Sequence, residues 1–138
     1  MNSWYHAVSA SHKWGGTPED YLAIEEFIDS SKQVIGDARH RSLYHHTLGV
    51  FLCEKIFGTI LEIRTEKTTS GGSTIHTTKG IPVRLIAERH IIEDLGRLPS
   101  PKDYIDGMLL AAWMSGAQRK EMGNFNDLFT KGEVNGAI

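Results

Sequence analysis

The sequence predicts one α+β domain that is predominantly helical, with about four helices and a single β-hairpin. Three observations lead to this prediction. Apolar residues recur at helical spacing in several segments that lie between proline or hydroxyl starts and glycine stops. One stretch near the middle instead alternates β-branched and charged residues. The length of 138 residues and the 40% hydrophobic content suit one core, so we expect residues 1–138 to form a single domain.

The N-terminal part should contain one well-defined helix. Residues 1–16 are interpreted as an irregular or partly helical lead-in that ends in two glycines. Thr17-Pro18-Glu19-Asp20 is typical of a helix start, since it combines a capping hydroxyl, a proline and acids beside the positive helix end. The apolar spacing that follows, and Gly36 beyond it, predict a helix over about 18–33.

A second helix is expected over about 37–57, ending at Gly58. Apolar residues occupy several sectors of its circumference, which is typical of a helix that is buried at the centre of a fold. Cys53 lies on its main apolar stripe and is interpreted as a small buried hydrophobic residue.

The pattern then changes to that of a β-hairpin. Residues 59–65 alternate apolar and charged side chains, the serines and glycines at 70–73 favour a turn, and residues 74–78 continue as the partner strand. The polar tip at 66–73 is expected to be mobile. Gly80-Ile81-Pro82 is predicted to break the second strand.

Two further helices follow. Helical periodicity returns over 83–95 and stops at Gly96, and Ser100-Pro101-Lys102-Asp103 repeats the cap-and-proline start for a last helix over about 101–115. A flexible C-terminal tail is expected from about residue 128.

Composition argues against several classes of protein. The net charge of −2 offers no general attraction to nucleic acid, so no nucleic-acid partner is expected. Cys53 is the single cysteine, which excludes an internal disulfide and a cysteine-based zinc finger and favours a reducing cytoplasm. No apolar run of ~20 residues predicts a membrane span, and no secretory signal is visible, so a cytoplasmic location is the expectation.

Histidine is frequent, with seven in the chain, and three of them lie in the predicted second helix. At about 100° per residue His40, His45 and His46 point to different sectors of a continuous helix. His40 and Glu54 would also lie roughly 21 Å apart along its axis. This helix therefore cannot form a metal site alone and needs ligands from elsewhere.

A second group of polar residues supplies such ligands. His90 and Asp94 are four residues apart in the 83–95 segment, so they share one edge of a helix. An imidazole and a carboxylate placed in this way could ligate a divalent metal such as zinc, or the acid could orient the histidine as a general base. The predicted metal site consists of His46, His90 and Asp94, joined by Glu54 or, alternatively, by His40.

Arginine side chains suit phosphate and carboxylate, so we predict an anion-binding set beside this site. It comprises Arg41, Arg84, His40 and His45. Structural interpretations remain open for the same residues. The His90–Asp94 pair is compatible with a simple helix-stabilising contact, and buried histidines are compatible with a structural hydrogen-bond network.

Two stretches of the chain combine into a recognisable pattern. The first contains Arg39-His40-Arg41, His45-His46, Gly49, Phe51, Glu54 and Phe57-Gly58, and the second is the Ile81–Pro99 stretch with its Ala87-Glu88, His90-Ile91 and Glu93-Asp94-Leu95-Gly96. Through these residues the chain resembles an uncharacterised family of short bacterial and phage-associated proteins. The resemblance covers about residues 12–105, including Trp14-Gly15-Gly16-Thr17-Pro18. It implies a bacterial or phage setting, in the host cytoplasm if phage-encoded, and a counter-defence role, but no established chemistry.

These observations support three expectations about function. The first is a binding protein whose His/Asp/Arg pocket takes a small anionic ligand, such as a nucleotide signal, or a host protein, with a homo-oligomer as one expected state. The second is a metal-dependent hydrolase of a phosphoester or nucleotide, in which a bound metal activates water. The third is a non-catalytic protein with a buried structural His/Asp network.

Overall fold

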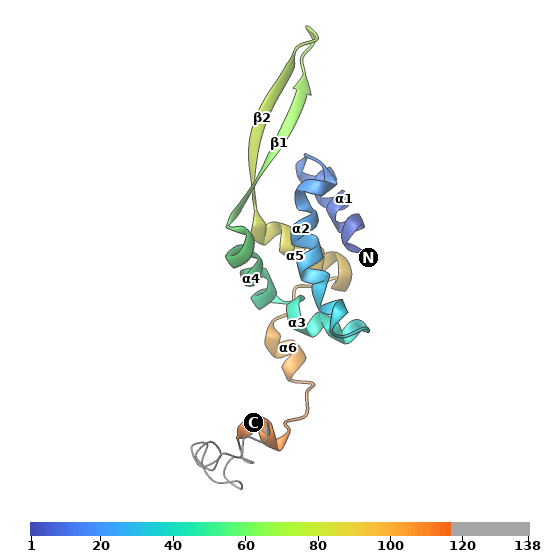
Figure 1. The fold of residues 1–138 in the computed structure, drawn as a ribbon, viewed down its shortest axis with the longest axis vertical. Helices are drawn as coiled ribbons and strands as arrows, with labels where there is room; N and C mark the ends of the chain where they lie inside the picture. The colour runs from blue at the N-terminus through green and yellow to red at the C-terminus, as the bar shows by residue number, and fades with distance from the viewer. Residues whose placement is uncertain (117–138) are drawn as a thin grey trace, which may run out of the picture. The chain divides into compact units, whose positions relative to one another are not determined.

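A computed structural model of the chain describes residues 1–116. Met1–Asp106 form one compact unit that holds six α-helices and a two-stranded antiparallel sheet (Figure 1). The predicted α+β class and the single hairpin are confirmed, whereas the expected four helices were too few. The chain from Gly107 onward forms a separate unit, whose described part contains the short 3₁₀ helix η3 (Ala112–Ser115). In the described part of the chain, every helix is too short or too polar to cross a bilayer.

The N-terminal lead-in is a full helix, α1 (Ser3–Trp14). The side chain of Asn2 accepts the Tyr5 N–H at 3.0 Å and so caps its first turn. Ala7 and Ala10 are fully buried, and their small side chains allow α1 to pack closely beside α2. The sequence prediction was incomplete here because alanine, serine and histidine carry little hydrophobic periodicity.

Helix α2 (Pro18–Asp29), extended by the 3₁₀ turn η1 (Ser30–Gln33), confirms the helix predicted over 18–33. Its start is the predicted one. The Thr17 N–H donates to the Asp20 carboxylate at 2.8 Å, and Pro18 occupies the first helical position.

The continuous helix predicted over 37–57 is wrong. The segment contains a 3₁₀ turn η2 (Ala38–His40), a one-turn helix α3 (Arg41–Tyr44) and a separate helix α4 (Thr47–Phe57). His46 between α3 and α4 is extended, with φ −162° and ψ 177°, and its Nδ1 accepts the Gly49 N–H at 3.2 Å. The His46 side chain thus caps the N-terminus of α4, which the sequence pattern did not predict.

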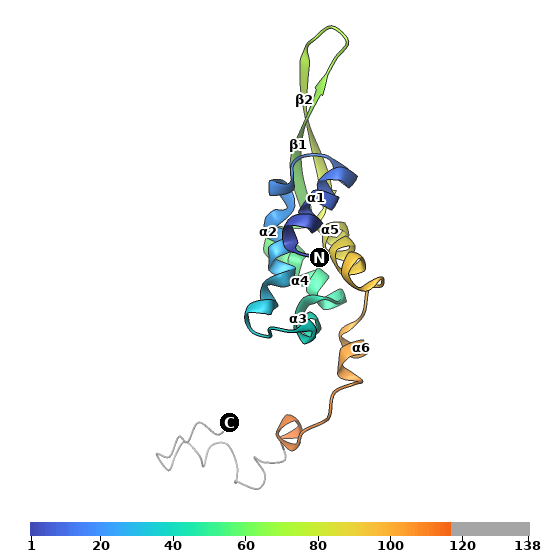
Figure 2. The ribbon, with the colours of Figure 1, turned by 90° about the vertical axis from the view of Figure 1, so that its right-hand side faces the viewer.

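The predicted hairpin is confirmed as β1 (Ile60–Thr68) paired with β2 (Thr74–Pro82). The predicted break at residues 80–82 does not occur, because Pro82 lies at the end of β2 opposite Ile60, and a proline is tolerated at that position. Only the base of the hairpin is buried, through Ile63 and Ile81, and the rest extends beyond the helices of the unit (Figures 1 and 2).

Helix α5 (Val83–Leu95) confirms the helix predicted over 83–95, and Gly96 ends it in the left-handed conformation. The last predicted helix, over 101–115, is wrong in length. It starts as expected, with the Ser100 N–H donating to Asp103 at 2.8 Å, but α6 ends at Ile105. The flexible tail expected from about residue 128 lies outside the described residues.

The core lies where α1, α2, α4 and α5 meet the base of the hairpin. Cys53 is fully buried there, as predicted. The thirteen buried apolar residues are Ala7, Ala10, Tyr21, Ile24, Ile28, Val50, Cys53, Ile63, Ile81, Val83, Ile86, Ala87 and Ile91. Beside this core lies a buried polar cluster, which is the candidate site.

Candidate metal centre

The buried cluster draws on four separate segments of the chain. Helix α1 contributes His6, α2 contributes Glu25 and Asp29, the bend between α3 and α4 contributes His45, and α5 contributes His90 and Asp94. All six side chains are buried, and the three imidazoles are fully so. Burying this much charge without compensation would cost several kcal/mol per ion, so each group must find a partner within the cluster.

Helical spacing places three acids and one histidine of the cluster on two helix faces. Glu25 and Asp29 are four residues apart on α2, and His90 and Asp94 are four apart on α5, so each pair occupies one helix face. His45 lies at the bend after Tyr44, where the chain leaves α3. The bend turns this ring toward the other helices, and its centroid lies 5.1 Å from that of His90.

Four ligand atoms of the cluster surround a common point. Two are imidazole nitrogens, Nε2 of His45 and of His90, and two are carboxylate oxygens, Oδ1 of Asp29 and Oδ2 of Asp94. His45 lies 3.0 Å from the Asp94 oxygen and 3.5 Å from that of Asp29. His90 lies 3.2 Å from the Asp29 oxygen and 3.4 Å from that of Asp94. All four atoms lie within 4.8 Å of one another.

The nitrogen–oxygen separations are close to those expected around a four-coordinate metal ion. Zinc bonds to histidine nitrogen and carboxylate oxygen measure about 2.0–2.2 Å, so the edges of a ZnN₂O₂ tetrahedron measure about 3.3–3.5 Å. The four nitrogen–oxygen edges observed here run from 3.0 to 3.5 Å. The four side chains therefore converge closely enough to share one ion, with the shortest separation, 3.0 Å between His45 and Asp94, slightly below the expected edge.

Three of the four candidate ligand residues form further hydrogen bonds through the atoms that do not face the common point. Nδ1 of His90 pairs with the Glu25 carboxylate at 2.5 Å. The second oxygen of Asp94 pairs with Nε2 of His6 at 3.1 Å, and the second oxygen of Asp29 accepts the Ser3 hydroxyl at 3.0 Å. Histidine ligands of metals commonly donate their other N–H to a carboxylate in this way, which orients the ring.

The fourth side chain is held through its backbone. The Tyr104 hydroxyl donates to the carbonyl oxygen of His45 at 2.9 Å. Nδ1 of His45 is buried and has no hydrogen-bond partner within residues 1–116. This histidine is therefore positioned by the bend rather than by a second polar side chain.

The electrostatics of the cluster are dominated by the carboxylates. Burial opposes a charge on His90, but hydrogen bonds with Asp29, Asp94 and Glu25 outweigh it and raise the pKa of His90 to about 10. Burial alone would raise the pKa of Asp29, yet its bonds to His90 and Ser3 lower it to about 2. The pKa of Asp94 likewise falls below its usual range, since bonds from three histidines exceed the effect of burial.

For His45 burial outweighs the hydrogen bond with Asp94 and lowers the pKa of the ring, which favours the neutral form that can ligate a metal. With neutral imidazoles, the set of two histidines and two aspartates has a formal charge of −2. A proton on His90 removes half of this charge, whereas a divalent cation removes all of it.

Comparison with known proteins places the chain in a family. A family model described as "Domain of unknown function (DUF6915)" matches residues 1–114. The chain belongs to this family. The match covers every residue of the buried cluster, and it confirms the predicted resemblance to an uncharacterised family without bearing on a phage origin. No curated protein and no solved structure matches the chain.

In this DUF6915 domain, the structure unites only part of the predicted site. His90 and Asp94, predicted as metal ligands from their spacing, lie side by side as expected. His45, predicted to contact an anionic ligand, joins them instead. Glu25 and Asp29 were missed, although their own i,i+4 spacing on the first predicted helix was a usable signal. His6 was missed because its helix was not predicted.

His46 and Glu54 are not part of the cluster. Nδ1 of His46 accepts the Gly49 N–H, and its Nε2 bonds to the Ser42 carbonyl at 3.0 Å, so backbone groups engage both ring nitrogens. Glu54 lies on α4 and is not among the described side chains whose ligand atoms converge, neither in the Asp29, His45, His90 and Asp94 set nor in a second set of His6, Glu25 and His90. The prediction treated 37–57 as one helix and therefore misplaced both side chains.

The predicted anion-binding set is brought together only in part, because the ring centroid of His40 lies 5.3 Å from that of His45. Nδ1 of His40 lies 3.0 Å from the Ser31 hydroxyl, which ties η2 to η1. Arg84 lies on the exposed side of α5 and pairs with Glu88 at 2.9 Å. Arg41 begins α3, and its Nε is buried without a hydrogen-bond partner in the described part of the chain.

Proposed function

We propose that this domain is a metal-binding protein, in which Asp29, His45, His90 and Asp94 hold one divalent ion of the zinc class. The observation that carries the proposal is the convergence of two imidazole nitrogens and two carboxylate oxygens, with nitrogen–oxygen distances of 3.0–3.5 Å and all four atoms within 4.8 Å of one another. Two nitrogen and two oxygen ligands suit zinc and neighbouring transition metals better than magnesium or calcium, which prefer oxygen alone.

The surroundings of the four ligands support a bound ion over a simple ion-pair network. A network needs only that each charge has an opposite partner, and a protonated His90 already offers that to its neighbours. Such a network explains His45 as a hydrogen-bond partner of Asp94 at 3.0 Å, but it does not require that the Nε2 atoms of His45 and His90 approach the same two carboxylate oxygens. A divalent cation accounts for both rings, because it accepts a lone pair from each.

The centre has the features of a structural site. Zinc enzymes use three protein ligands and leave a fourth position for water or substrate, whereas structural sites use four protein ligands and are closed. The four side chains here are each at most 6% exposed. This favours a metal-stabilised binding domain over the metal-dependent hydrolase considered from the sequence.

The experiment is metal analysis of the untagged protein, purified without chelators after growth with added zinc. We expect about one zinc per chain by elemental mass spectrometry. Replacement by Co²⁺ should produce the intense visible bands of a tetrahedral cobalt centre. His45→Ala and Asp94→Asn should lose the metal, and His76→Ala is the matched control, because that histidine lies exposed on the hairpin.

The structural-network alternative predicts a different result. If the purified protein contains no stoichiometric metal, and neither Zn²⁺ nor Co²⁺ binds more tightly than the micromolar range, the proposal is wrong and the cluster is a set of buried ion pairs. Asp94→Asn keeps the size of the side chain, so far-ultraviolet circular dichroism of this variant separates loss of metal from loss of fold.

The other expectations from the sequence stay predictions. They are a bacterial or phage setting, a counter-defence role, a host partner and a homo-oligomer. A metal-binding domain is compatible with each of them. Size-exclusion chromatography with light scattering on the zinc-loaded protein will give the oligomeric state.

A further inference from the structure

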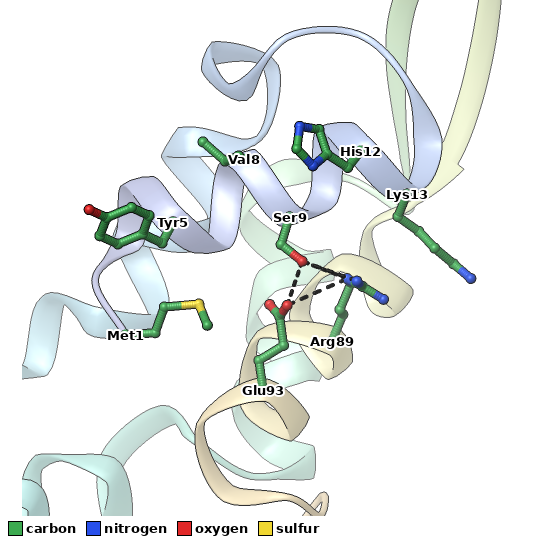
Figure 3. Close-up of a pocket in the computed structure, with 8 residues that line it drawn as sticks. All are labelled: Met1, Tyr5, Val8, Ser9, His12, Lys13, Arg89 and Glu93. Carbon is green, nitrogen blue, oxygen red and sulfur yellow. Dashed lines mark hydrogen bonds and ion pairs between the residues drawn. The ribbon is translucent and has the colours of Figure 1, made fainter.

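A groove separate from the buried centre lies between α1 and α5 (Figure 3). Helix α1 contributes Tyr5, Val8, Ser9, His12 and Lys13, which recur at helical spacing and so share one face. Helix α5 contributes Arg89 and Glu93, one turn apart. The cavity measures about 600 Å³, within the range of small-molecule sites.

The two ends of the groove differ in chemistry. Figure 3 shows Lys13 and Arg89 at one end and Tyr5 with Met1 at the other. One end therefore offers two positive charges, and the other offers an aromatic ring that is 60% exposed. Val8 lies between them on the wall formed by α1.

Arg89 is held in place before any ligand arrives. Its Nε and Nη2 donate to the Ser9 hydroxyl at 3.3 and 3.0 Å, and its guanidinium lies 5.8 Å from the centre of the Trp14 ring. A guanidinium has five N–H donors, so donors remain for an anion. Fixing the side chain in advance reduces the entropy that binding would otherwise cost.

Glu93 is the single acid that lines the groove, and other groups already compensate its charge. One carboxylate oxygen pairs with Nδ1 of His6 at 3.0 Å, and the other accepts the Ser9 hydroxyl at 2.5 Å. Arg89 lies 3.8 Å from the same oxygen. Among the lining side chains, Lys13, Arg89 and Glu93 leave a net positive charge of one, and the ammonium of Met1, which lies 3.5 Å from Asp94, adds a further positive group.

We propose that this groove binds a small organic anion, consisting of a phosphate or carboxylate attached to a flat ring. The anionic group binds Lys13 and Arg89, whose geometry and charge suit phosphate and carboxylate. The ring lies along Val8 and stacks on Tyr5, as bases commonly stack on aromatic side chains. This site is different from the anion-binding set predicted from the sequence, and it needs no metal.

The probe is a nucleoside monophosphate, AMP, compared by calorimetry with its two halves, adenosine and inorganic phosphate. We expect saturable binding of AMP, and binding of either half to be at least about tenfold weaker, because each half engages one end only. Lys13→Ala should weaken AMP about tenfold, and Tyr5→Ala should weaken AMP while leaving phosphate unchanged. Lys67→Ala is the matched control, since Lys67 is exposed on β1.

Each other outcome overturns the proposal. The proposal is wrong if AMP shows no saturable binding at concentrations up to about 10 mM, where even weak ligands are detected. Equal affinity in wild type and Lys13→Ala would also overturn it, as would tighter binding of inorganic phosphate than of AMP. The titrations are run on both zinc-supplemented and chelator-treated protein. If the protein binds AMP but never zinc, the proposed metal centre is wrong and the proposed groove ligand is supported. If it binds zinc but not AMP, the groove proposal is wrong and the metal centre is unaffected.

Discussion

His90 occupies the position on which the buried cluster depends. Its Nδ1 faces Glu25, and its Nε2 faces Asp29 and Asp94, so one ring contacts carboxylates from two helices. Its face stacks on His6 with the ring centroids 3.7 Å apart. The other five side chains of the cluster all lie next to this ring.

Glu25 should act on the metal only through His90. Glu25→Gln keeps the shape of the side chain but removes the negative charge that orients the imidazole and increases its basicity. We expect zinc affinity to fall about 10- to 100-fold, as is typical when a carboxylate partner of a histidine ligand is lost. Competition with a chromophoric chelator measures this. Glu26→Gln is the control, because Glu26 is the exposed neighbour in sequence.

Gly49 is required by a close approach of the backbone. A Cβ at this position would lie only 1.8 Å from the Tyr44 carbonyl oxygen. We expect Gly49→Ala to reduce the free energy of unfolding by about 3 kcal/mol, since the α3–α4 bend must shift to relieve the overlap. Urea denaturation measures the loss.

The matched control is Gly36→Ala. A Cβ at Gly36 would meet nothing within 4 Å, and Gly36 is not among the positive-φ glycines. Its midpoint in urea should stay close to that of the wild type. Equal midpoints for Gly49→Ala and the wild type would contradict the tight bend described here.

At the scale of elements, the bend at residues 45–46 gives two adjacent histidines different roles, although the sequence predicted both on one continuous helix. His45 turns into the cluster, while His46 starts α4 by accepting the Gly49 N–H. Adjacent histidines in a continuous helix would be about 100° apart. In the structure, the extended backbone of His46 breaks the helix between them.

His46→Ala should therefore weaken the fold and leave the metal in place. We expect a loss of about 1–2 kcal/mol, because the Gly49 N–H and the Ser42 carbonyl both lose a partner. His46→Asn should recover part of this, since its amide oxygen can accept the same N–H. Metal content measured on both variants decides the role, and loss of zinc from folded His46→Asn would reinstate His46 as a ligand.

At the scale of the whole Met1–Asp106 unit, the proposed ion joins segments that are far apart in sequence. Its ligands come from α2, from the α3–α4 bend and from α5, so the ion cross-links three parts of the fold. An ion that binds the folded state and not the unfolded state stabilises by mass action.

Removal of the metal should lower the melting temperature strongly. With free zinc at about 1,000 times the dissociation constant, bound metal contributes about 4 kcal/mol. This corresponds to roughly 15 °C for a unit of this size. Scans by circular dichroism before and after dialysis against a chelator measure it, and added Zn²⁺, but not Mg²⁺, should reverse the change. An unaltered melting temperature would show that no metal stabilises the fold.

Much of the secondary structure was predictable because it depends on local chemistry. Cap residues and prolines at 17–20 and 100–103 marked two helix starts, and Gly96 marked a stop. The alternation of residues near 59–78 predicted the hairpin, and the spacing of His90 and Asp94 placed both on one face of α5. Each of these signals operates over a few residues, so the sequence displays it directly.

Tertiary contacts decided the remainder. The break at His46 depends on a ring nitrogen meeting a backbone N–H three residues later, and α1 depends on the burial of Ala7 and Ala10 against α2. The cluster joins His6, Glu25, His45 and His90, whose side chains meet only when the helices pack. Periodicity shows which side chains share a helix face, but packing determines which faces meet, and that is why the sequence predicted half of the candidate centre.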